Sequence, residues 1–194
     1  MIVRLVQNSE NLIEVYRLRY SVYITELSNK VPDADHHQGL LSDNSDRKSA
    51  EILGAYYDDK LCGTLRYNPL TEYRRDELPF FQVPEFCWDH PEQTVITSML
   101  VVHPEWRRSK TYISLFREGI RLQLERGRQY CLLYAEPHNA ALFAKSGFKY
   151  LSQEPMRHPL YRDVLPMILR AGDEIHPILR VDCGKTRKLY GKEL

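Results

Sequence analysis

Long hydrophobic runs are absent from this 194-residue sequence: none approaches the roughly 18 residues that read as a membrane span, and no apolar leader opens the chain. The four cysteines are scattered and form no Cys-x-x-Cys pair: Cys62, Cys87, Cys131 and Cys183. Such spacing gives no sign of a zinc site or a disulfide framework. We therefore expect a cytoplasmic protein that uses no metal and keeps its cysteines as free thiols.

An excess of charge of either sign is also lacking. The sequence has 27 basic and 26 acidic residues, which gives a net charge of +1 at pH 7. Without a basic surplus, we expect no nucleic-acid partner. No internal repeat is present, and the length suits a single domain over residues 1–194, with residues 170–194 as a C-terminal extension.

The most informative stretch lies between residues 95 and 150. Residues 95–102 form a short apolar run rich in β-branched side chains, which predicts a buried strand. An amphipathic helix follows and ends near Gly127, with apolar residues at Ile113, Phe116, Ile120 and Leu124. A second strand at 130–135 leads into a short helix at 139–146. This order predicts a βαβ crossover with two parallel neighbouring strands.

The remaining elements read as follows. Residues 1–6 predict a first strand, and Ser9 is a suitable N-cap for a helix that continues to about Leu27. Residues 52–67 predict a hairpin around the turn Asp58-Asp59-Lys60. Two further antiparallel strands are expected at 148–151 and 164–170.

A basic turn precedes the long amphipathic helix. Arg107, Arg108 and Lys110 stand where a helix N-terminus offers unpaired amides and a partial positive charge, so the turn can hold a phosphate or diphosphate. The alternative is a solvated basic turn. Basic residues remain dense from Arg107 to Arg128, which indicates either a docking face for an acidic partner or a solvated helix face.

Two phrases resemble the GCN5-related N-acetyltransferase (GNAT) superfamily: Met99-Leu-Val-Val-His-Pro-Glu-Trp-Arg-Arg108 and Asn139-Ala-Ala-Leu-Phe-Ala-Lys-Ser-Gly-Phe148. The resemblance implies an α/β fold with a central mixed sheet and helices on both faces. It also implies that acyl-CoA, or the acyl-phosphopantetheine of an acyl carrier protein, is bound by residues in and next to these phrases, namely Val102, Arg107, Arg108, Ser109, Lys110, Thr111, Asn139 and Phe143.

The sequence departs from that family in two places. Its two loop glycines, which let backbone amides approach a diphosphate, are replaced by Lys110 and Tyr112. The tyrosine that many members use as a general acid is replaced by Phe143, so that role does not transfer.

The opening helix carries a second resemblance. Arg19-Tyr-Ser-Val-Tyr-Ile-Thr-Glu-Leu27, followed by Arg66 after the hairpin, is similar to the acyl-homoserine lactone synthases and N-acyl amino acid synthases, a GNAT-fold branch that uses long acyl chains. The charges with which lactone synthases hold their acceptor are replaced by Ile96 and Met99, so we expect a different small amine acceptor. This resemblance implies that the substrates contact Arg19, Tyr23, Arg66, Thr97, Ser98 and Met99.

Two irregular segments leave alternatives open. In residues 28–49, His36 and His37 lie near two aspartates, which fits a metal site less well than a loop, and Asp43 and Asp46 are candidates for salt bridges to the two arginines of the second resemblance. Residues 68–92 are rich in proline and aromatic side chains (Phe80, Phe81, Phe86 and Trp88), which form either one wall of an acyl pocket or a layer packed on the sheet.

The expected reaction is direct attack of an amine on a thioester, since no Ser/His/Asp or Cys/His arrangement indicates a covalent intermediate. A backbone amide near Leu100 or Val101 would polarise the carbonyl, and Glu136 and His138 are candidate general bases, or else a turn and a helix cap. The alternatives are a conventional acetyl-CoA-dependent acetyltransferase and a non-catalytic binding domain. An acidic acyl carrier protein is the expected partner at the basic face.

Overall fold

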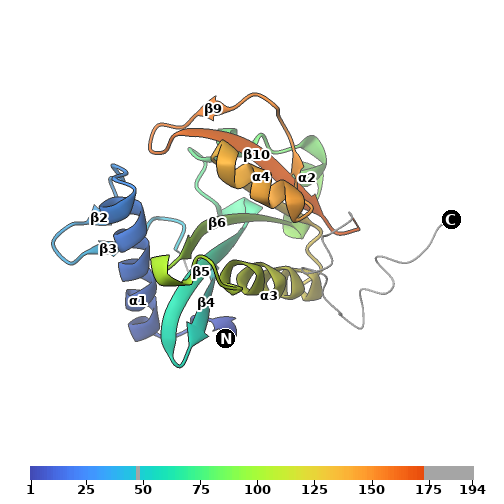
Figure 1. Ribbon diagram of the computed structural model, residues 1–194. Coiled ribbons are helices and arrows are strands. Elements are labelled where there is room, and N and C mark those ends of the chain that lie inside the picture. The colour runs from blue at the N-terminus through green and yellow to red at the C-terminus, as the bar shows by residue number, and fades with distance from the viewer. Residues whose placement is uncertain (47–48, 173–194) are drawn as a thin grey trace.

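The computed structural model describes residues 1–46 and 49–172. These residues form an eight-stranded mixed sheet in the order β1-β4-β5-β6-β7-β10-β8, with β9 paired to β10 (Figure 1). The mixed α/β sheet predicted from the sequence is confirmed. The strands of this sheet are β1 (Ile2–Leu5), β4 (Glu51–Tyr57), β5 (Lys60–Pro69), β6 (Thr94–Val102), β7 (Tyr130–Ala135), β8 (Lys149–Tyr150), β9 (Met156–Arg157) and β10 (Asp163–Arg170).

The first half of the sheet is antiparallel. β4 and β5 form the predicted hairpin, whose two-residue turn places Asp58 and Asp59 at φ values of 46° and 61°. A turn with two positive φ values matches the twist of the flanking strands. A separate pair of two-residue strands, β2 (Ala34–Asp35) and β3 (Leu40–Leu41), forms a small hairpin beside α1.

The helix that follows β1 differs from the expectation in two ways. α1 spans Ser9–Tyr20, and its N-cap is Asn8, whose side chain accepts a hydrogen bond from the Asn11 amide at 2.8 Å; the prediction of Ser9 as the cap was wrong. The helix then continues as a π-helix over Ser21–Glu26, so its length was predicted but its winding was not. π-helical turns are rare and often occur at functional sites.

The βαβ crossover is confirmed. β6 leads through η5 (Pro104–Trp106) into α3 (Thr111–Glu125), and the chain returns as β7, parallel to β6. The parallel pairing covers only Thr94–Ile96 against Tyr130–Leu132, so the remaining lengths of the two strands separate. α4 (Pro137–Lys145) follows, and β8 and β10 form the predicted antiparallel pair.

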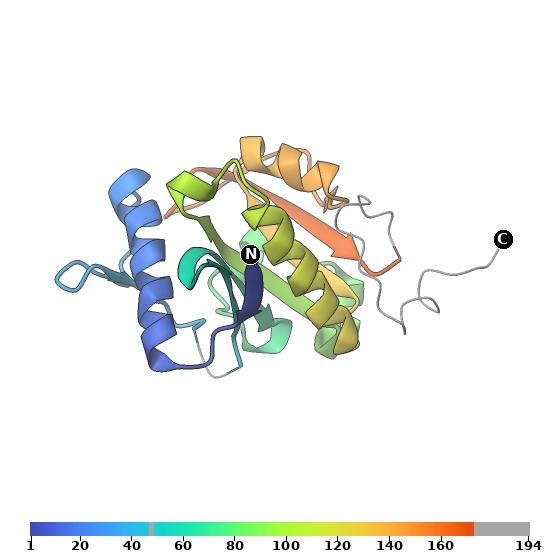
Figure 2. The ribbon, with the colours of Figure 1, turned by 60° about the horizontal axis from the view of Figure 1, so that its bottom comes forward.

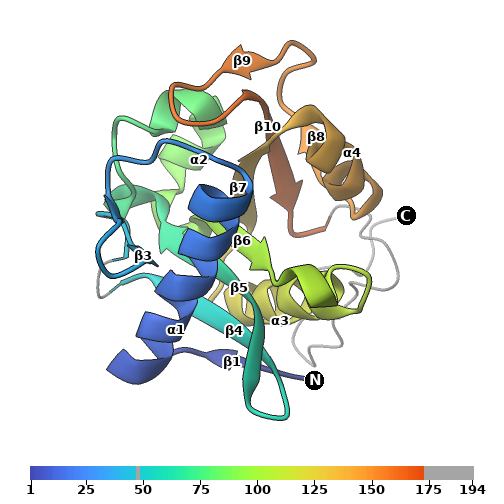
Figure 3. The same cartoon turned by 60° about the vertical axis from the view of Figure 1, so that its left-hand side comes forward.

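Helices and loops cover both faces of the sheet. Figure 2 shows α3 in front of the strands, and Figure 3 shows α1 in front of the sheet with α3 behind it. α3 and α4 bury an aromatic core that includes Phe116, Phe143 and Phe148. The opposite face packs against the segment after β5, which contains η2 (Leu70–Glu72), η3 (Leu78–Phe81), α2 (Glu85–Asp89) and η4 (Pro91–Gln93).

Several further expectations concern single residues. Cys62, Cys87 and Cys131 are free, as predicted, and all three are buried. Cys183 and most of the expected C-terminal extension lie outside the described residues. No helix in the described part of the chain is long and apolar enough to cross a membrane.

Candidate active site

A pocket of about 540 Å³ lies where β6 and β7 separate. This volume is within the range of small-molecule sites. Most of the site residues expected from the sequence line it: Tyr23, Arg66, Thr97, Ser98, Met99, Leu100, Val101, Val102, Arg107, Glu136, His138, Asn139 and Phe143. The others are not part of its lining: Arg19, Arg108, Ser109, Lys110 and Thr111.

A bulge in β6 shapes one wall of the pocket. Arg66 of β5 lies opposite Ser98, but Thr64 lies opposite Val101, so two steps along β5 correspond to three along β6. The extra length is taken up at Met99, whose φ of 52° is unusual for a residue other than glycine. Such a bulge changes the direction of the backbone that follows it, which here is Leu100.

The tyrosine of the π-helical turn contacts this backbone. The Tyr23 hydroxyl donates a hydrogen bond of 3.4 Å to the Leu100 carbonyl oxygen. Burial raises the pKa of Tyr23, so the hydroxyl stays protonated and able to donate. Beyond Ile96, the edge of β6 that faces β7 has no strand partner within the described part of the chain. The unpaired part of β6 therefore lines the pocket.

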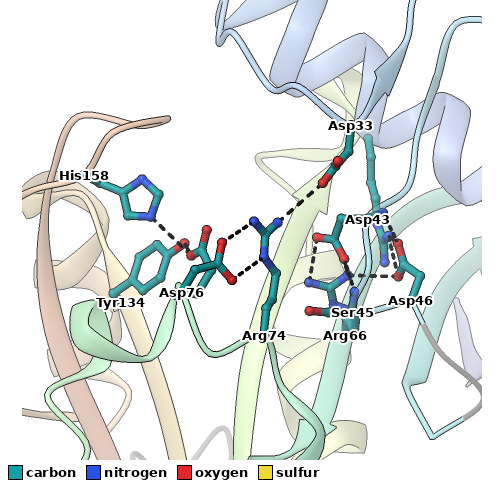
Figure 4. Close-up of polar contacts among 11 residues, drawn as sticks. Asp33, Asp43, Ser45, Asp46, Arg66, Arg74, Asp76, Tyr134 and His158 are labelled. Atoms are coloured by element: carbon teal, nitrogen blue, oxygen red, sulfur yellow. Dashed lines mark hydrogen bonds and ion pairs between the residues drawn. The ribbon is translucent and has the colours of Figure 1, made fainter.

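The two arginines of the second resemblance lie in a buried ionic cluster (Figure 4). One terminal nitrogen of Arg19 lies 2.8 Å from both carboxylate oxygens of Asp46. Arg66 binds Asp43 through two nitrogens, at 2.6 and 3.1 Å, and reaches Asp46 at 3.0 Å. The salt bridges expected from the sequence are confirmed. We call Arg19, Asp43, Asp46 and Arg66 the ionic cluster.

The charges of the ionic cluster determine its role. Burial alone would raise the pKa of Asp46, but the charges of Arg19 and Arg66 lower it below its ordinary value. Arg66 also donates a hydrogen bond of 3.0 Å to Ser98 Oγ, which connects the cluster to β6 next to the bulge. Only Arg66 and Asp43 border the pocket, and Arg19 lies behind them. The cluster thus holds the loop after β3, which carries Asp43 and Asp46, against β5 and β6.

A second buried polar cluster was missed by the sequence analysis. The Tyr134 hydroxyl donates a hydrogen bond of 2.7 Å to Glu77 Oε2, and His158 Nε2 lies 3.2 Å from the same oxygen. Glu77 and Tyr134 line the pocket, and Tyr161 stacks on His158 with ring centroids 4.7 Å apart. The members come from three segments that are far apart in sequence, so no spacing pattern in the sequence predicts the cluster. We call Glu77, Tyr134 and His158 the glutamate cluster.

The expected wall of aromatic residues is present only in part. Of the four aromatics named from residues 68–92, Phe81 lines the pocket. Phe80 packs against His158 at 4.2 Å between ring centroids, and Phe86 packs against Tyr130 at 5.2 Å. Trp88 is 48% exposed. For Phe80 and Phe86 the packing alternative is the better description, whereas the exposed Trp88 fits neither alternative.

The basic turn before α3 is largely engaged within the molecule. Arg107 makes two hydrogen bonds of 2.5 Å to Glu26, and the Thr111 amide donates to Ser109 Oγ at 3.2 Å. Further along, Arg121 pairs with Glu118 and Glu125, while Arg126 and Arg128 pair with Glu51. Among the described residues, the basic side chains of this stretch without an ion pair are Arg108, Lys110 and Arg117.

The remaining candidates are placed as follows. Glu136 and His138 stand at the start of α4, with His138 Nδ1 3.6 Å from the Glu136 carboxylate. His36 is engaged by the Tyr20 hydroxyl at 2.9 Å. In the parts of the chain that the structure describes, no group of three or more His, Cys, Asp or Glu side chains is arranged to hold a metal ion.

Known proteins with the same architecture include three informative structures. The N-acyl amino acid synthase FeeM from uncultured soil microbes shares 13% identity, with a TM-score of 0.70 over 87% of this chain and 90% of FeeM. The CoA-dependent acyl-homoserine lactone synthase MesI shares 16% identity, with a TM-score of 0.70 over 99% and 96%. A putative N-acetyltransferase from Lactobacillus plantarum shares 15%, with a TM-score of 0.63 over 87% and 97%.

No curated protein sequence matches the chain. At these identities the structural likeness establishes the fold, which is that of the GNAT superfamily. The family model described as N-acyl amino acid synthase FeeM matches residues 14–170, which is well over half of the chain. The chain therefore belongs to the FeeM family of N-acyl amino acid synthases and is an acyltransferase of the GNAT fold.

Proposed function

We propose that the protein transfers a long acyl group from a phosphopantetheine thioester to the amino group of a free amino acid by direct attack. One observation carries this proposal: β6 and β7 part after three residue pairs and leave a pocket with unpaired β6 backbone in its wall. A thioester is already reactive, so the protein has only to position it, stabilise the oxyanion and receive a proton. A backbone amide near Leu100 or Val101 is our candidate for the oxyanion donor.

The donor is bound at the end of the pocket formed by α4 and the turn before α3. Asn139 and Phe143 line that end and suit the pantetheine arm. A diphosphate cradle is less well provided, because the Thr111 amide is occupied by Ser109 and the usual loop glycines are replaced by bulky residues. A single phosphate on an acyl carrier protein therefore fits better than coenzyme A. The exposed Arg108 and Lys110 are available for an acidic carrier.

The acceptor is bound at the opposite end, beside the glutamate cluster. Among the described residues, three arginines line the pocket. Arg66 is neutralised by Asp43 and Asp46, and Arg107 lies at the donor end. Arg74 is the remaining one; it binds the exposed Asp76 through two nitrogens, at 2.6 and 3.2 Å, and lies 3.4 Å from the partly exposed Asp33, so an incoming carboxylate would displace one of these solvated partners. We assign to Arg74 the carboxylate of the amino acid, because a guanidinium binds a carboxylate in a planar, two-point contact.

A donor and acceptor panel tests the proposal. The full chain is incubated with long-chain acyl carrier protein, long-chain acyl-CoA or acetyl-CoA, together with amino acids and their decarboxylated amines. Free thiol and N-acyl product are measured. We expect the long-chain carrier-protein donor and the amino acids to give the highest kcat/KM. Preference for acetyl-CoA would indicate a conventional acetyltransferase instead, and absence of turnover with every pair would overturn the proposal.

The assignment of Arg74 has its own control. Arg74→Gln should raise the KM for amino acids by about ten-fold or more, because it removes a charge-assisted contact. It should leave the KM for the matching decarboxylated amines nearly unchanged. An equal effect on both acceptor types would show that Arg74 does not bind the carboxylate.

A further inference from the structure

The glutamate cluster offers one carboxylate oxygen that has no hydrogen-bond partner. Tyr134 and His158 both bind Oε2 of Glu77, whereas Oε1 accepts no hydrogen bond from a described residue. Glu77 is 6% exposed yet lines the pocket, so the surface it retains faces the space where β6 and β7 part. Figure 4 labels Tyr134 and His158, which both bind Glu77 Oε2, and it labels Arg74 on the same segment as Glu77.

His158 is held in one tautomer by its backbone contacts. Its Nδ1 accepts hydrogen bonds from the amides of Leu160, at 3.1 Å, and Tyr161, at 3.3 Å, so this nitrogen carries no proton. Nε2 must then be the protonated nitrogen, and it donates to Glu77. Both ring nitrogens are used, which leaves His158 unable to act on a substrate. Its function is to hold the carboxylate.

The carboxyl group of Glu77 is ionised at neutral pH. Burial alone would raise its pKa, but the hydrogen bonds from His158 and Tyr134 outweigh burial, and the pKa lies below its ordinary value. The titratable and charged groups around it are Tyr73 and Arg74 from its own segment, Tyr134 from β7, and His158 and Tyr161 from the loop that leads into β10.

We propose that Glu77 is the general base of the reaction: its Oε1 accepts a hydrogen bond from the acceptor's neutral amino group and takes the proton that the nitrogen must lose. This inference rests on the function proposed above and assigns a residue to it. Glu77 and Arg74 both line the pocket, carry opposite charges and interact electrostatically, which suits the oppositely charged amino and carboxylate groups of an α-amino acid. Glu136 and His138, the bases expected from the sequence, belong instead to the donor end at the start of α4.

The proton balance is as follows. The amino group of a free amino acid stands beside its own carboxylate, which holds its pKa above the value near 8 of a chain N-terminus, so the acceptor arrives mainly as the ammonium and loses one proton to solvent before its lone pair can attack. As the N–C bond forms, the nitrogen becomes strongly acidic and passes one proton to Glu77 Oε1. The tetrahedral oxyanion collapses, the C–S bond breaks, and the departing thiolate takes up the proton from Glu77 through solvent. The products are an amide and a free thiol.

The test compares Glu77→Gln with the wild-type chain and with Glu85→Gln, which changes an exposed carboxylate outside the pocket at the start of α2. We expect Glu77→Gln to lower kcat by about 100-fold or more, with the KM of the acyl donor unchanged, and Glu85→Gln to match wild type. In Glu77→Ala, added formate should restore part of kcat, which a purely structural role would not allow. If wild type is active and Glu77→Gln keeps kcat within about three-fold, the inference is wrong.

A second variant decides the question if the Glu77 substitutions do not fold. Tyr134→Phe removes one hydrogen bond from the ionised carboxylate, so the pKa of Glu77 should rise. The acidic fall in kcat, measured at saturating acceptor, should then move to higher pH than in wild type. An unmoved profile would overturn the inference. Inactivity of the wild-type chain with every donor and acceptor would instead overturn the proposed function itself.

Discussion

The ionic cluster and the glutamate cluster border the same pocket, but they are built differently. The ionic cluster contains two cations and two anions, so its charges balance, and Asp46 is shared between Arg19 and Arg66. The glutamate cluster contains one anion, held by a phenol and by an imidazole whose second nitrogen is occupied. In that cluster one oxygen is left over.

This difference indicates that the ionic cluster stabilises the fold, whereas the glutamate cluster can take part in the reaction. A balanced buried ion network resists any change in its partners, because removal of one charge leaves another buried and unpaired. Such a network holds a loop in place but has nothing to offer a substrate. A single buried anion with a free oxygen can receive a proton from a group bound beside it. Stability and activity should therefore respond to different mutations.

The largest expected effect comes from breaking the ionic cluster. Asp46→Ala leaves Arg19 without its anion at 0% side-chain exposure, so the free energy of unfolding should fall by about 3–5 kcal/mol. Urea denaturation followed by circular dichroism measures this change. Glu77→Gln keeps the shape of its site and should cost far less stability. A loss below about 1 kcal/mol for Asp46→Ala would remove the distinction between the clusters.

Within the ionic cluster, the two arginines should differ. Arg66 uses its fork on Asp43 and also binds Ser98, so Arg66→Lys should destabilise by about 2–4 kcal/mol. Arg19 uses one terminal nitrogen, and its other two nitrogens have no hydrogen bond, so Arg19→Lys should cost about 1 kcal/mol or less. Thermal unfolding of the matched pair checks the order, and a reversed order would contradict the contacts described.

Both clusters should contribute to the change of the free energy of unfolding with pH. Asp46 and Glu77 have pKa values below the ordinary 3.8 and 4.5, so their ionised forms favour folding above those values. That stabilisation is lost as the pH falls below 4 toward the folded-state pKa values. Asp46→Asn should therefore show a smaller loss of stability between pH 5 and 3 than wild type. Parallel curves for the two proteins would contradict the shift at Asp46.

The smallest effect is expected from an ion pair on the surface next to the glutamate cluster. Arg157 lies 3.5 Å from Asp163, with side chains 77% and 53% exposed. Water and salt screen such a pair, so Arg157→Ala should change the free energy of unfolding by no more than about 0.5 kcal/mol and leave kcat unaltered. A larger loss would show that exposure is not what separates this pair from the buried ones.

The sequence predicted the parts of the structure that depend on local pattern. Alternating and periodic apolar residues located the hairpin, the crossover and α3, and the second resemblance brought Arg19 and Arg66 together with Asp43 and Asp46. The π-helical turn escaped prediction because its side chains keep a near-helical spacing. The bulge at Met99 also escaped, since methionine gives no sign of a positive φ.

The glutamate cluster escaped for another reason. Glu77 and His158 are 81 positions apart and lie in irregular segments, where hydrophobic periodicity carries no information. Their encounter depends on how the segment after β5 packs over β7 and β10, which is a property of the assembled sheet. A lone glutamate between two prolines of a loop is indistinguishable in sequence from a solvated one.

The three residue pairs that join β6 to β7 have a mechanical consequence. They connect the two halves of the sheet at one end only. Small rotations about Thr94–Ile96 change the width of the opening near Leu100 far more than they change the contacts at the joint. We expect the protein to accept acyl chains of different width by such a rotation, without a change in the structure of either half of the sheet.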